Sequence, residues 1–208
     1  MARSEAGLMK LLMSPLSPYA RKVRVLIREA GREAEVEELA VQTSALATDP
    51  TIPPYNPTGR IPVLVRPDGP ALFDSRVICR FLDARWSLGL YPEPRLWEVL
   101  TLEALAEGIL DSALLMAYEI RLRPEERRFP DWIEAQWSKI ARALDSIEGR
   151  WQSHLAAPFD MAQIALACAL GYLDFRHDAR CWREGRPGLA AWEARLRDRP
   201  SLAATRPQ

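Results

Sequence analysis

The sequence predicts a mixed α/β domain followed by an all-helical domain, and two observations carry this prediction. Before about residue 90, short apolar runs alternate with turn signals, as expected of strands and their connections. After it, apolar residues recur every three or four positions over long stretches, as expected of amphipathic helices. The linker SLGLYPEP (87–94) separates the regions. We therefore place one domain at 8–86 and another at 95–208.

The strands of the first domain are predicted from short apolar or alternating segments. LMKLLM (8–13) is an apolar run and predicts a buried strand, whereas EVEELAV (35–41) alternates polar and apolar residues and predicts a second. IPVLVRPDGPALF (61–73) predicts a hairpin whose turn lies at 67–70.

The helices of the first domain are predicted from their end signals. SPYARKVRVLIREAG (17–31) starts with Ser17 as N-cap, and Pro18 suits the first helical position. DSRVICRFLDARW (74–86) predicts another helix. The irregular stretch 43–59, rich in proline and turn dipeptides, has room for a short helix. The predicted order is strand, helix, strand, optional helix, strand, strand, helix.

The second domain shows helical periodicity throughout. One predicted helix ends before Pro124 and has this apolar face: Leu102, Leu105, Ile109, Ala113, Met116 and Ile120. The next has this one: Ile133, Trp137, Ile140, Leu144, Ile147 and Trp151. MAQIALACALGYLDF (161–175) is apolar nearly all round and predicts the buried central helix. GLAAWEARLRDRP (188–200) predicts a last amphipathic helix that Pro200 ends.

Charge and composition exclude several classes of function. The 208 residues contain 28 Lys and Arg against 28 Asp and Glu, so the formal net charge is zero. Binding to nucleic acid or to a membrane surface generally needs a basic excess, so we expect neither partner. No apolar run approaches the roughly 20 residues of a membrane-spanning helix.

The cysteines and histidines predict a reduced chain without metal. Cys79, Cys168 and Cys181 are odd in number and have no CxxC spacing, so they suggest neither a disulfide framework nor a zinc site. A reducing cytoplasm is therefore the expected location. His154 and His177 are too few for most metal sites.

Three stretches of the first domain carry the candidate chemistry. The first holds Ser14 and Ser17 in SPLSPY, where a strand is expected to turn into a helix. In the second, NPTGRIPVL (56–64), Pro62 opens a predicted strand. Because proline cannot donate to a sheet, it belongs at an edge or a special turn, and we expect a cis Ile61-Pro62 bond. This would leave the backbone of Ile61 free to pair with an extended ligand.

The third stretch is Asp74-Ser75, at a predicted helix start. A helix start offers free N–H groups and positive potential, which suit a carboxylate. Asp74 is suited to an ammonium group, with a plain capping role as the alternative. A ligand with a carboxylate and an ammonium on one carbon fits this pair.

The segments SPYARKVRVLIREAG, NPTGRIPVL, LFDSRVICRFLD and PGLAAWEARLRDRPS occur in this order and together resemble a cytosolic, bacterial-type glutathione transferase with a serine-type active site. The resemblance covers about residues 8–200. Each motif alone is weak, but four in register are specific. The resemblance implies a thioredoxin-like, glutathione-binding domain at 8–86 and an all-helical glutathione-transferase domain at 95–208. It also implies a homodimer with a role in detoxification.

The resemblance implies how glutathione, the co-substrate, would bind. The tripeptide would lie antiparallel to the segment that enters Pro62 and pair with Ile61, as an added strand. Its γ-glutamyl end would sit on Asp74 and Ser75. Its glycine carboxylate would lie near Arg60, for which a solvated turn position is an equal alternative. No metal or redox cofactor is implied.

Ser17 is the candidate catalytic residue. SPYA (17–20) occupies the place where thioredoxins carry CxxC and omega-type transferases carry Cys-Pro-Phe or Cys-Pro-Tyr. A serine there cannot form mixed disulfides, but its hydroxyl can donate a hydrogen bond to a glutathione thiolate. Capping alone is the alternative. Ser14 is the competing candidate for thiol activation, because it aligns nearer the tyrosine or serine that other transferase classes use. If Ser17 activates the thiol, we assign Ser14 to glutathione binding. Tyr19 is assigned to packing.

The implied second substrate is a small hydrophobic electrophile. Asp111, Leu115 and Tyr118 have helical spacing on the long helix after the linker and are its candidate contacts. For each of them, packing or plain exposure is the alternative. The chain departs from the family at one helix start. The family usually has a Ser or Thr N-cap with an Asp three residues later, and Asp160 and Gln163 take these two places here. We expect them to form a reciprocal capping box.

Two other functions compete with a transferase. The first is a non-catalytic binding or regulatory protein of this fold, and the second is a glutathione-dependent isomerase or dehalogenase. The presence of Ser17, Pro62, Asp74 and Ser75 favours the enzyme. SPLSPY lacks the serine-serine-cysteine cluster of zeta-type isomerases.

Overall fold

The computed structural model describes residues 7–207, which divide into two compact units. The first unit ends at Gly89 and the second spans Leu90–Arg206. Strands and helices alternate in the first unit, and the second consists of helices and turns within the described residues. This confirms the predicted fold class, a mixed α/β domain followed by a helical one.

The sheet of the first unit has four strands in the order β2-β1-β3-β4. Their bounds are β1 Met9–Met13, β2 Val36–Ala40, β3 Val63–Arg66 and β4 Gly69–Leu72. β1 runs parallel to β2 and antiparallel to β3, which forms an antiparallel hairpin with β4. Each strand falls inside the segment predicted for it.

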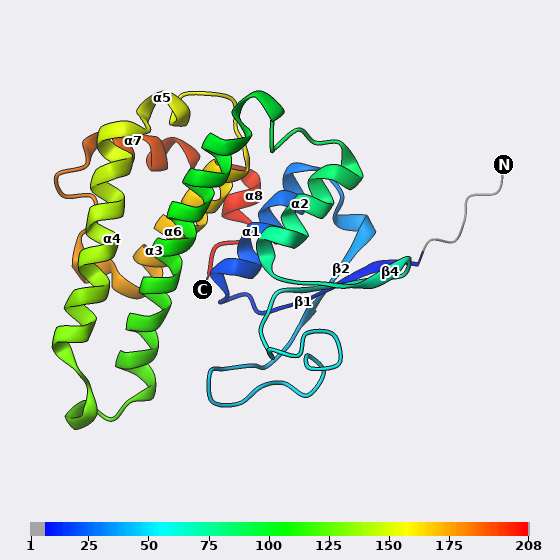
Figure 1. Ribbon diagram of the computed structural model, residues 1–208, viewed down its shortest axis with the longest axis horizontal. Helices are drawn as coiled ribbons and strands as arrows, with labels where there is room; N and C mark the ends of the chain where they lie inside the picture. The colour runs from blue at the N-terminus through cyan, green and yellow to red at the C-terminus, as the bar shows by residue number, and fades with distance from the viewer. Residues whose placement is uncertain (1–6, 208) are drawn as a thin grey trace. The chain divides into compact units, whose positions relative to one another are not determined.

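Two helices, α1 (Pro18–Glu29) and α2 (Ser75–Trp86), pack side by side on one face of this sheet (Figure 1). A short 3₁₀ turn, η1 (Glu33–Glu35), leads into β2. On the sheet's other face Ile52 is fully buried against Leu12 and Val63. The optional helix at 43–59 does not form, because turns and side-chain hydrogen bonds satisfy this segment.

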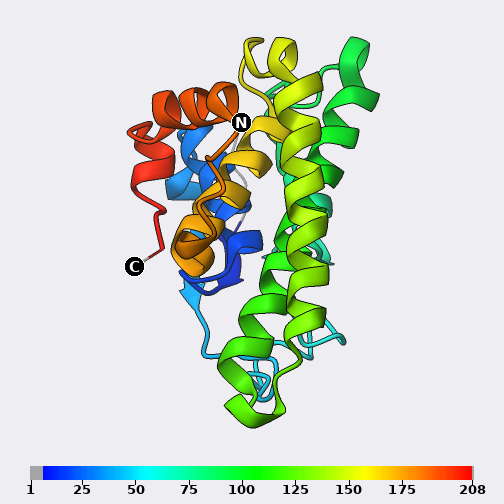
Figure 2. The ribbon, with the colours of Figure 1, turned by 90° about the vertical axis from the view of Figure 1, so that its left-hand side faces the viewer.

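The second unit is built on long helices. Their bounds are α3 Leu96–Leu122, α4 Pro130–Arg150, α5 Gln152–Leu155, α6 Met161–His177, α7 Pro187–Leu196 and α8 Pro200–Ala203, with 3₁₀ turns η2 Glu93–Arg95, η3 Glu125–Arg127 and η4 Asp178–Arg180. α3 and α4 run side by side along most of their length (Figure 2). α6 is buried over most of its residues, which confirms its predicted central position.

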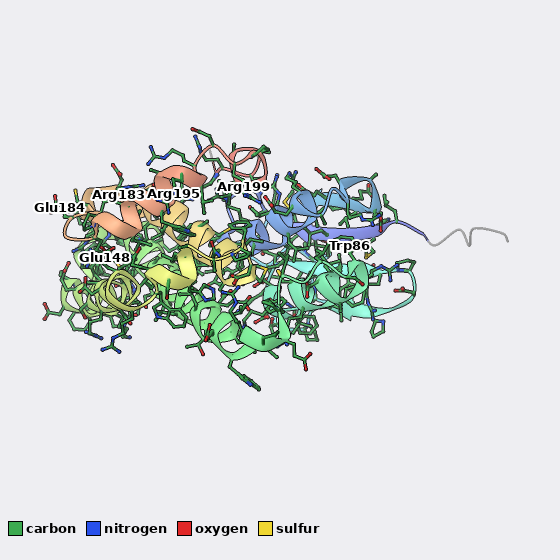
Figure 3. All side chains as sticks on the ribbon, turned by 90° about the horizontal axis from the view of Figure 1, so that it is seen from above. Trp86, Glu148, Arg183, Glu184, Arg195 and Arg199 are labelled. Atoms are coloured by element: carbon green, nitrogen blue, oxygen red, sulfur yellow. The ribbon has the colours of Figure 1, made fainter. Side chains whose placement is uncertain are left out.

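Polar contacts hold these helices together. The buried ring of His177, at the end of α6, lies with Nε2 2.8 Å from the carbonyl oxygen of Ala113 on α3. Glu148 of α4, labelled in Figure 3, accepts hydrogen bonds from the amides of Gly188 (2.9 Å) and Leu189 (2.7 Å) at the start of α7. α6 therefore packs on α3, and α4 anchors α7.

The predicted end of the last helix is wrong. α7 ends at Leu196, and Pro200 starts the short helix α8 instead of stopping its predecessor. Proline is favoured at the first helical position, because its missing N–H is not needed there and its φ is already helical.

Candidate functional site

The three candidate stretches meet at one end of the sheet of the first unit. Leu12 of β1 pairs with Val63 of β3, and Leu64 of β3 pairs with Leu72 of β4. Because β3 runs antiparallel to both neighbours, the end of β1, the start of β3 and the end of β4 lie at the same edge. Ser14 and Ser17 follow β1, Ile61-Pro62 precede β3, and Asp74-Ser75 follow β4, so the topology brings all three stretches together.

The side chain of Ser17 caps α1. Its backbone is extended (φ −79°, ψ 118°), and its Oγ accepts a hydrogen bond of 3.2 Å from the amide of Ala20. Pro18 holds the first helical position, where no amide proton is needed. The predicted capping role is therefore present, since one lone pair of the hydroxyl is used.

The Ser17 hydroxyl retains a proton that it can donate. Among residues 7–207, no acceptor for this proton lies within hydrogen-bonding distance. A hydroxyl carries one donor and two lone pairs, so capping leaves the donor free for a ligand. The first turn of α1 has no acidic side chain, so the positive potential of the helix start is not neutralised.

Ser14 lies one turn earlier, in the loop between β1 and α1. Its Oγ accepts a long hydrogen bond of 3.4 Å from the amide of Leu16, and its carbonyl accepts one of 3.0 Å from Ser17. It therefore shapes the turn that presents Ser17. Tyr19, in the first turn of α1, is half-buried.

The second stretch contains the expected cis bond between Ile61 and Pro62. Within the described residues, neither the amide nor the carbonyl of Ile61 has a hydrogen-bond partner. Pro62 itself is buried. Ile61 thus offers one free backbone donor and one free acceptor beside the first residue of β3.

Asn56 is a residue of this stretch that the sequence analysis did not single out. It is 2% exposed. Its Nδ2 donates to the carbonyl of Arg60 (2.8 Å), while its Oδ1 accepts from the amide (3.1 Å) and hydroxyl (2.9 Å) of Thr58. It thereby fixes the loop that leads into Ile61. Asn-Pro marks a turn in the sequence, but the sequence does not say which carbonyl the asparagine reaches.

Gly59 belongs to the same loop. Its φ is +68°, and a Cβ there would lie 2.9 Å from the Thr48 side chain. The position therefore requires glycine for both its backbone conformation and its space.

At the third stretch, Asp74 caps α2. Its Oδ1 accepts from the amide of Arg76 (3.0 Å) and its Oδ2 from the Arg76 guanidinium (3.2 Å). Burial raises the pKa of this carboxyl, but the hydrogen bonds and charge of Arg76 outweigh burial and hold the pKa below its ordinary value. Asp74 is therefore an anion at neutral pH. It follows a cis peptide bond after Phe73, which the sequence did not suggest.

Ser75, the first residue of α2, is 2% exposed, and its hydroxyl has no hydrogen-bond partner among residues 7–207. An anionic side chain and a free hydroxyl thus lie next to each other at the start of α2. This is the arrangement that the sequence predicted for an ammonium and a carboxylate.

The remaining candidates are all at least partly accessible. Arg60 is exposed, and its guanidinium has no ion-pair partner within the described residues. In the second unit, Asp111 and Leu115 are exposed and Tyr118 is half-buried, all on α3. Leu115 is thus not core packing.

The start of α6 is a purely structural cap. The Asp160 carboxylate accepts from the amide of Gln163 at 3.1 Å. The expected reciprocal hydrogen bond, from the Asp160 amide to the Gln163 side chain, does not form, so this part of the prediction is wrong. The Gln163 side chain instead donates to three carbonyls of the preceding loop: those of His154, Ala157 and Pro158. Within the described residues the carbonyls of Ala157 and Pro158 have no other hydrogen-bond partner, so the Gln163 amide satisfies them, whereas the His154 carbonyl also accepts from the Ala157 amide (3.0 Å).

Residues 7–207 contain neither a metal-binding cluster nor a membrane-spanning helix. No group of three or more His, Cys, Asp or Glu residues there is arranged to hold a metal ion. No helix in this range has the length and hydropathy needed to cross a membrane. Cys79 and Cys168 are buried, Cys181 is exposed, and none of the three forms a disulfide within this range.

Two family models match the chain. The model of the glutathione S-transferase N-terminal domain matches residues 16–85, and that of the C-terminal domain matches residues 130–195. The chain is also similar to a protein of Escherichia coli (strain K12) that is described as uncharacterized GST-like protein YibF. The two are 35% identical over 205 residues, which cover 96% of this chain and 98% of that protein.

Solved structures give the same relationship. A glutathione transferase family member from Pseudomonas fluorescens Pf-5 with bound glutathione is 43% identical, with a TM-score of 0.92 over 96% of this chain and 99% of that one. A family member from the same organism with bound S-(propanoic acid)-glutathione is 42% identical, with a TM-score of 0.88 over 96% and 100% of the two chains.

Proposed function

Because the chain belongs to the glutathione S-transferase family, we propose that it is a transferase whose Ser17 hydroxyl activates the thiol of glutathione. The observation that carries this proposal is that three stretches with unused hydrogen-bonding or charged groups lie at one end of the sheet. They supply a free hydroxyl proton at Ser17, a free backbone edge at Ile61, and an anion beside a free hydroxyl at Asp74 and Ser75.

These groups match the extended tripeptide in order. The cysteinyl backbone of glutathione pairs with the free amide and carbonyl of Ile61, which extends the sheet by one short strand. The γ-glutamyl ammonium meets Asp74, and the carboxylate on the same carbon meets Ser75 and the α2 amides. The glycine carboxylate is left for Arg60. This placement puts the sulfur toward Ser17. The bound glutathione of the Pseudomonas relative supports the same ligand for this chain.

The magnitudes are sufficient for thiol activation. A free thiol with a pKa of about 8.5 is roughly 3% ionised at pH 7. A pKa lower by about two units makes most of it thiolate, which requires about 2.7 kcal/mol of differential stabilisation. One charge-assisted hydrogen bond contributes about 1.5–3 kcal/mol, and the helix start adds about 0.3–1 kcal/mol.

The reaction is then a nucleophilic substitution or addition at carbon. The glutathione thiolate attacks an electrophilic carbon of a small hydrophobic substrate, and the thiol proton leaves to solvent. Asp111, Leu115 and Tyr118 of α3 contact this second substrate. The S-(propanoic acid)-glutathione bound by a relative has a carbon group on the glutathione sulfur, which supports a conjugation reaction here.

We further propose a homodimer that works in a reducing cytoplasm in detoxification. Cysteines that form no disulfide, such as Cys79, Cys168 and Cys181 within residues 7–207, are typical of such a compartment. The dimer rests on family resemblance, and sedimentation at micromolar concentration tests it.

A thermal-shift titration tests glutathione binding directly. At 100 times the dissociation constant, a ligand specific for the native state adds about 2.7 kcal/mol of stability, so the melting temperature rises. The matched control is the tripeptide with an ordinary α-glutamyl bond, which moves the ammonium and carboxylate away from Asp74 and Ser75. No shift with millimolar glutathione, or equal shifts with both peptides, would contradict the proposal and favour a binding protein without this activity.

A further inference from the structure

The connection between β2 and β3, residues 41–62, leads directly into β3 and contains neither a helix nor a strand. Connections in compact domains are mostly shorter, and long ones without regular structure are commonly functional. Such a segment has to satisfy its backbone through turns and side-chain hydrogen bonds. The hydrogen bonds that fix its shape therefore determine how Arg60 and Ile61 are presented to a ligand.

The carboxylate of Asp49 closes the first half of this segment. Its Oδ2 accepts from the amide of Gln42 (3.1 Å), and its Oδ1 accepts from the amide (2.9 Å) and the hydroxyl (2.6 Å) of Thr51. The amide of Asp49 donates to the hydroxyl of Thr43 at 3.4 Å. These hydrogen bonds, above all the one from the Thr51 hydroxyl, hold the pKa of the Asp49 carboxyl below its ordinary value. At neutral pH both of its oxygens are therefore acceptors.

Asp49 is connected in both directions along the chain. Its carboxylate holds Gln42, which follows Val41, and the amide of Val41 donates to the carbonyl of Met13 at the end of β1 (2.9 Å). In the other direction, the carbonyl of Asp49 accepts from the amide of Ile52 (3.1 Å), whose side chain is fully buried. Asp49 therefore links the end of β1 to the buried anchor of the second half of the segment.

The second half of the segment continues this series of hydrogen bonds up to Ile61. The carbonyl of Ile52 accepts from the amide of Asn56 (2.9 Å), and the carbonyl of Asn56 accepts from the amide of Gly59 (2.9 Å). The Asn56 side chain donates to the carbonyl of Arg60 at 2.8 Å. Because each bond starts where the previous one ends, a change in the first half of the segment reaches the residue before Ile61.

We propose that Asp49 is a positioning residue for glutathione, because its carboxylate holds residues 42–60 in the shape that presents the backbone of Ile61 and the side chain of Arg60. The inference rests on the proposed function, which pairs glutathione with these two residues. When the segment is already ordered, binding does not have to order it, so loss of Asp49 weakens affinity. Ser17 lies outside the segment, and activation of the thiol therefore does not depend on Asp49.

Hydrogen exchange in the protein without ligand tests whether Asp49 orders the segment. The amides of Ile52, Asn56 and Gly59 are hydrogen-bonded within it, and their exchange rates report how often these bonds open. We expect D49A to exchange these amides about tenfold faster than the wild type, as followed by NMR. Unchanged exchange of the three amides in D49A overturns the proposal.

Calorimetry with glutathione tests the consequence for the ligand. We expect D49A to raise the Kd about tenfold, because the segment then has to be ordered on binding. D49N should raise it only about threefold, since the amide oxygen can still accept from Thr51 while the NH₂ group cannot accept from the amide of Gln42. A Kd in D49A equal to that of the wild type overturns the proposal. If D49A does not fold, an unchanged Kd in D49N overturns it.

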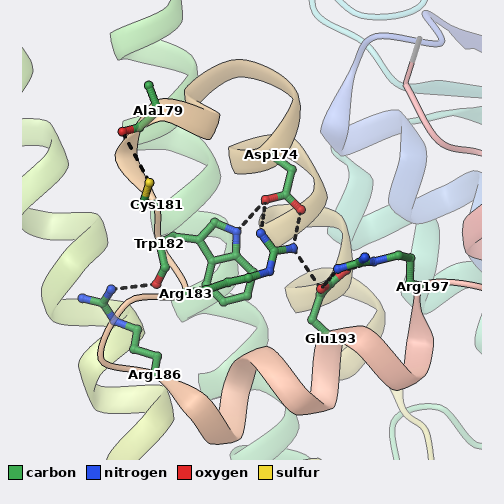
Figure 4. Close-up of polar contacts among 8 residues, drawn as sticks. All are labelled: Asp174, Ala179, Cys181, Trp182, Arg183, Arg186, Glu193 and Arg197. Carbon is green, nitrogen blue, oxygen red and sulfur yellow. Dashed lines mark hydrogen bonds and ion pairs between the residues drawn. The ribbon is translucent and has the colours of Figure 1, made fainter.

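The matched control is Asp174 of the second unit, a carboxylate that also accepts three hydrogen bonds (Figure 4). Two of them, both of 2.7 Å, come from Arg183, and one of 2.8 Å comes from the indole of Trp182. D174N should therefore lower the melting temperature, but change the Kd for glutathione less than about twofold. If D174N weakens binding as much as D49A, the loss reflects general destabilisation, and the positioning role is refuted.

Thiolate absorbance and affinity together separate this inference from the proposed function. At saturating glutathione, the absorbance per bound ligand should be equal in D49A and the wild type, because Ser17 is intact in both. A lower absorbance in D49A would mean that Asp49 acts on the thiol, which contradicts its role at Ile61. If the wild type binds no glutathione, the proposed function fails and this inference fails with it. If the wild type binds glutathione and D49A binds it equally well, the inference alone is refuted.

Discussion

Two helices begin at the same end of the sheet and carry opposite kinds of cap. α1 is capped by the neutral hydroxyl of Ser17, which accepts from Ala20 at 3.2 Å and keeps its proton. α2 is capped by the carboxylate of Asp74, which accepts from Arg76 at 3.0 Å and has no proton to give. The helix geometry is alike, so the difference lies in the chemistry of the cap.

This difference assigns an opposite ligand charge to each helix start. At α1 the positive potential is not cancelled by an acidic side chain and the Ser17 hydroxyl has a donor without an acceptor, so the place suits an anion such as a thiolate. At α2 the carboxylate offsets the potential and attracts a cation, while the neighbouring Ser75 can still serve an anion. A tripeptide with a thiol on its middle residue and an ammonium at one end matches the preferred ligand charge at both helix starts.

The largest expected effect comes from removing the donor at α1. Ser17→Ala should lower turnover about 10- to 1000-fold, because a thiolate hydrogen bond worth roughly 1.5–4 kcal/mol is lost. Steady-state kinetics with excess glutathione measures this. Ser17→Thr keeps the hydroxyl and is the matched control, and Ser17→Cys should shift the enzyme toward disulfide exchange. Undiminished turnover in Ser17→Ala would refute the assignment.

The next effect concerns affinity at α2. Asp74→Ala should weaken glutathione binding about tenfold and leave turnover at saturation nearly unchanged, since the lost partner is an ammonium far from the sulfur. The exposed position of Asp74 keeps the effect modest through solvent screening. Calorimetry with S-methylglutathione measures it, and unchanged affinity would place the ammonium elsewhere.

The same carboxylate predicts a pH dependence. Its pKa in the folded protein lies below the ordinary value of about 3.9, so it stays ionised until the pH falls below that value. Its contribution to stability and to binding is therefore present at higher pH and is lost as the pH falls through the folded pKa. Affinity for S-methylglutathione should drop at acidic pH more in the wild type than in Asp74→Asn. Parallel curves would contradict this.

The smallest effect is expected at the competing serine. Ser14→Ala removes only the long hydrogen bond to the Leu16 amide, so turnover should change less than about threefold. Equal rates in wild type and Ser17→Ala, together with a collapse in Ser14→Ala, would reverse the roles of the two serines.

Local signals in the sequence were enough to predict most of the fold. The start of α1 follows from Ser17 and Pro18, and the hairpin from its apolar runs and turn residues. The end of α7 was placed wrongly, because a proline can stop one helix or start the next and only the tertiary setting decides. The cis Ile61-Pro62 bond was expected from a proline at the entrance of a strand.

The site was less predictable where it depends on contacts between distant residues. Ser17, Ile61 and Asp74 could be named, because each lies at a recognisable strand or helix end. Asn56 could not, since its role is a side-chain bond to the carbonyl of Arg60 within a loop that has no regular pattern. Whether Ser17 and Asp74 perform the proposed chemistry stays a prediction.

The ionisation of bound glutathione tests the central claim most directly. Thiolate absorbance is followed against pH in the complexes of the wild type and Ser17→Ala. The account predicts a thiol pKa about two units below the free value of about 8.5 in the wild type, and a rise of about one to two units in Ser17→Ala. The same low pKa in both proteins would contradict the account, because the backbone amides and the helix potential alone would then activate the thiol.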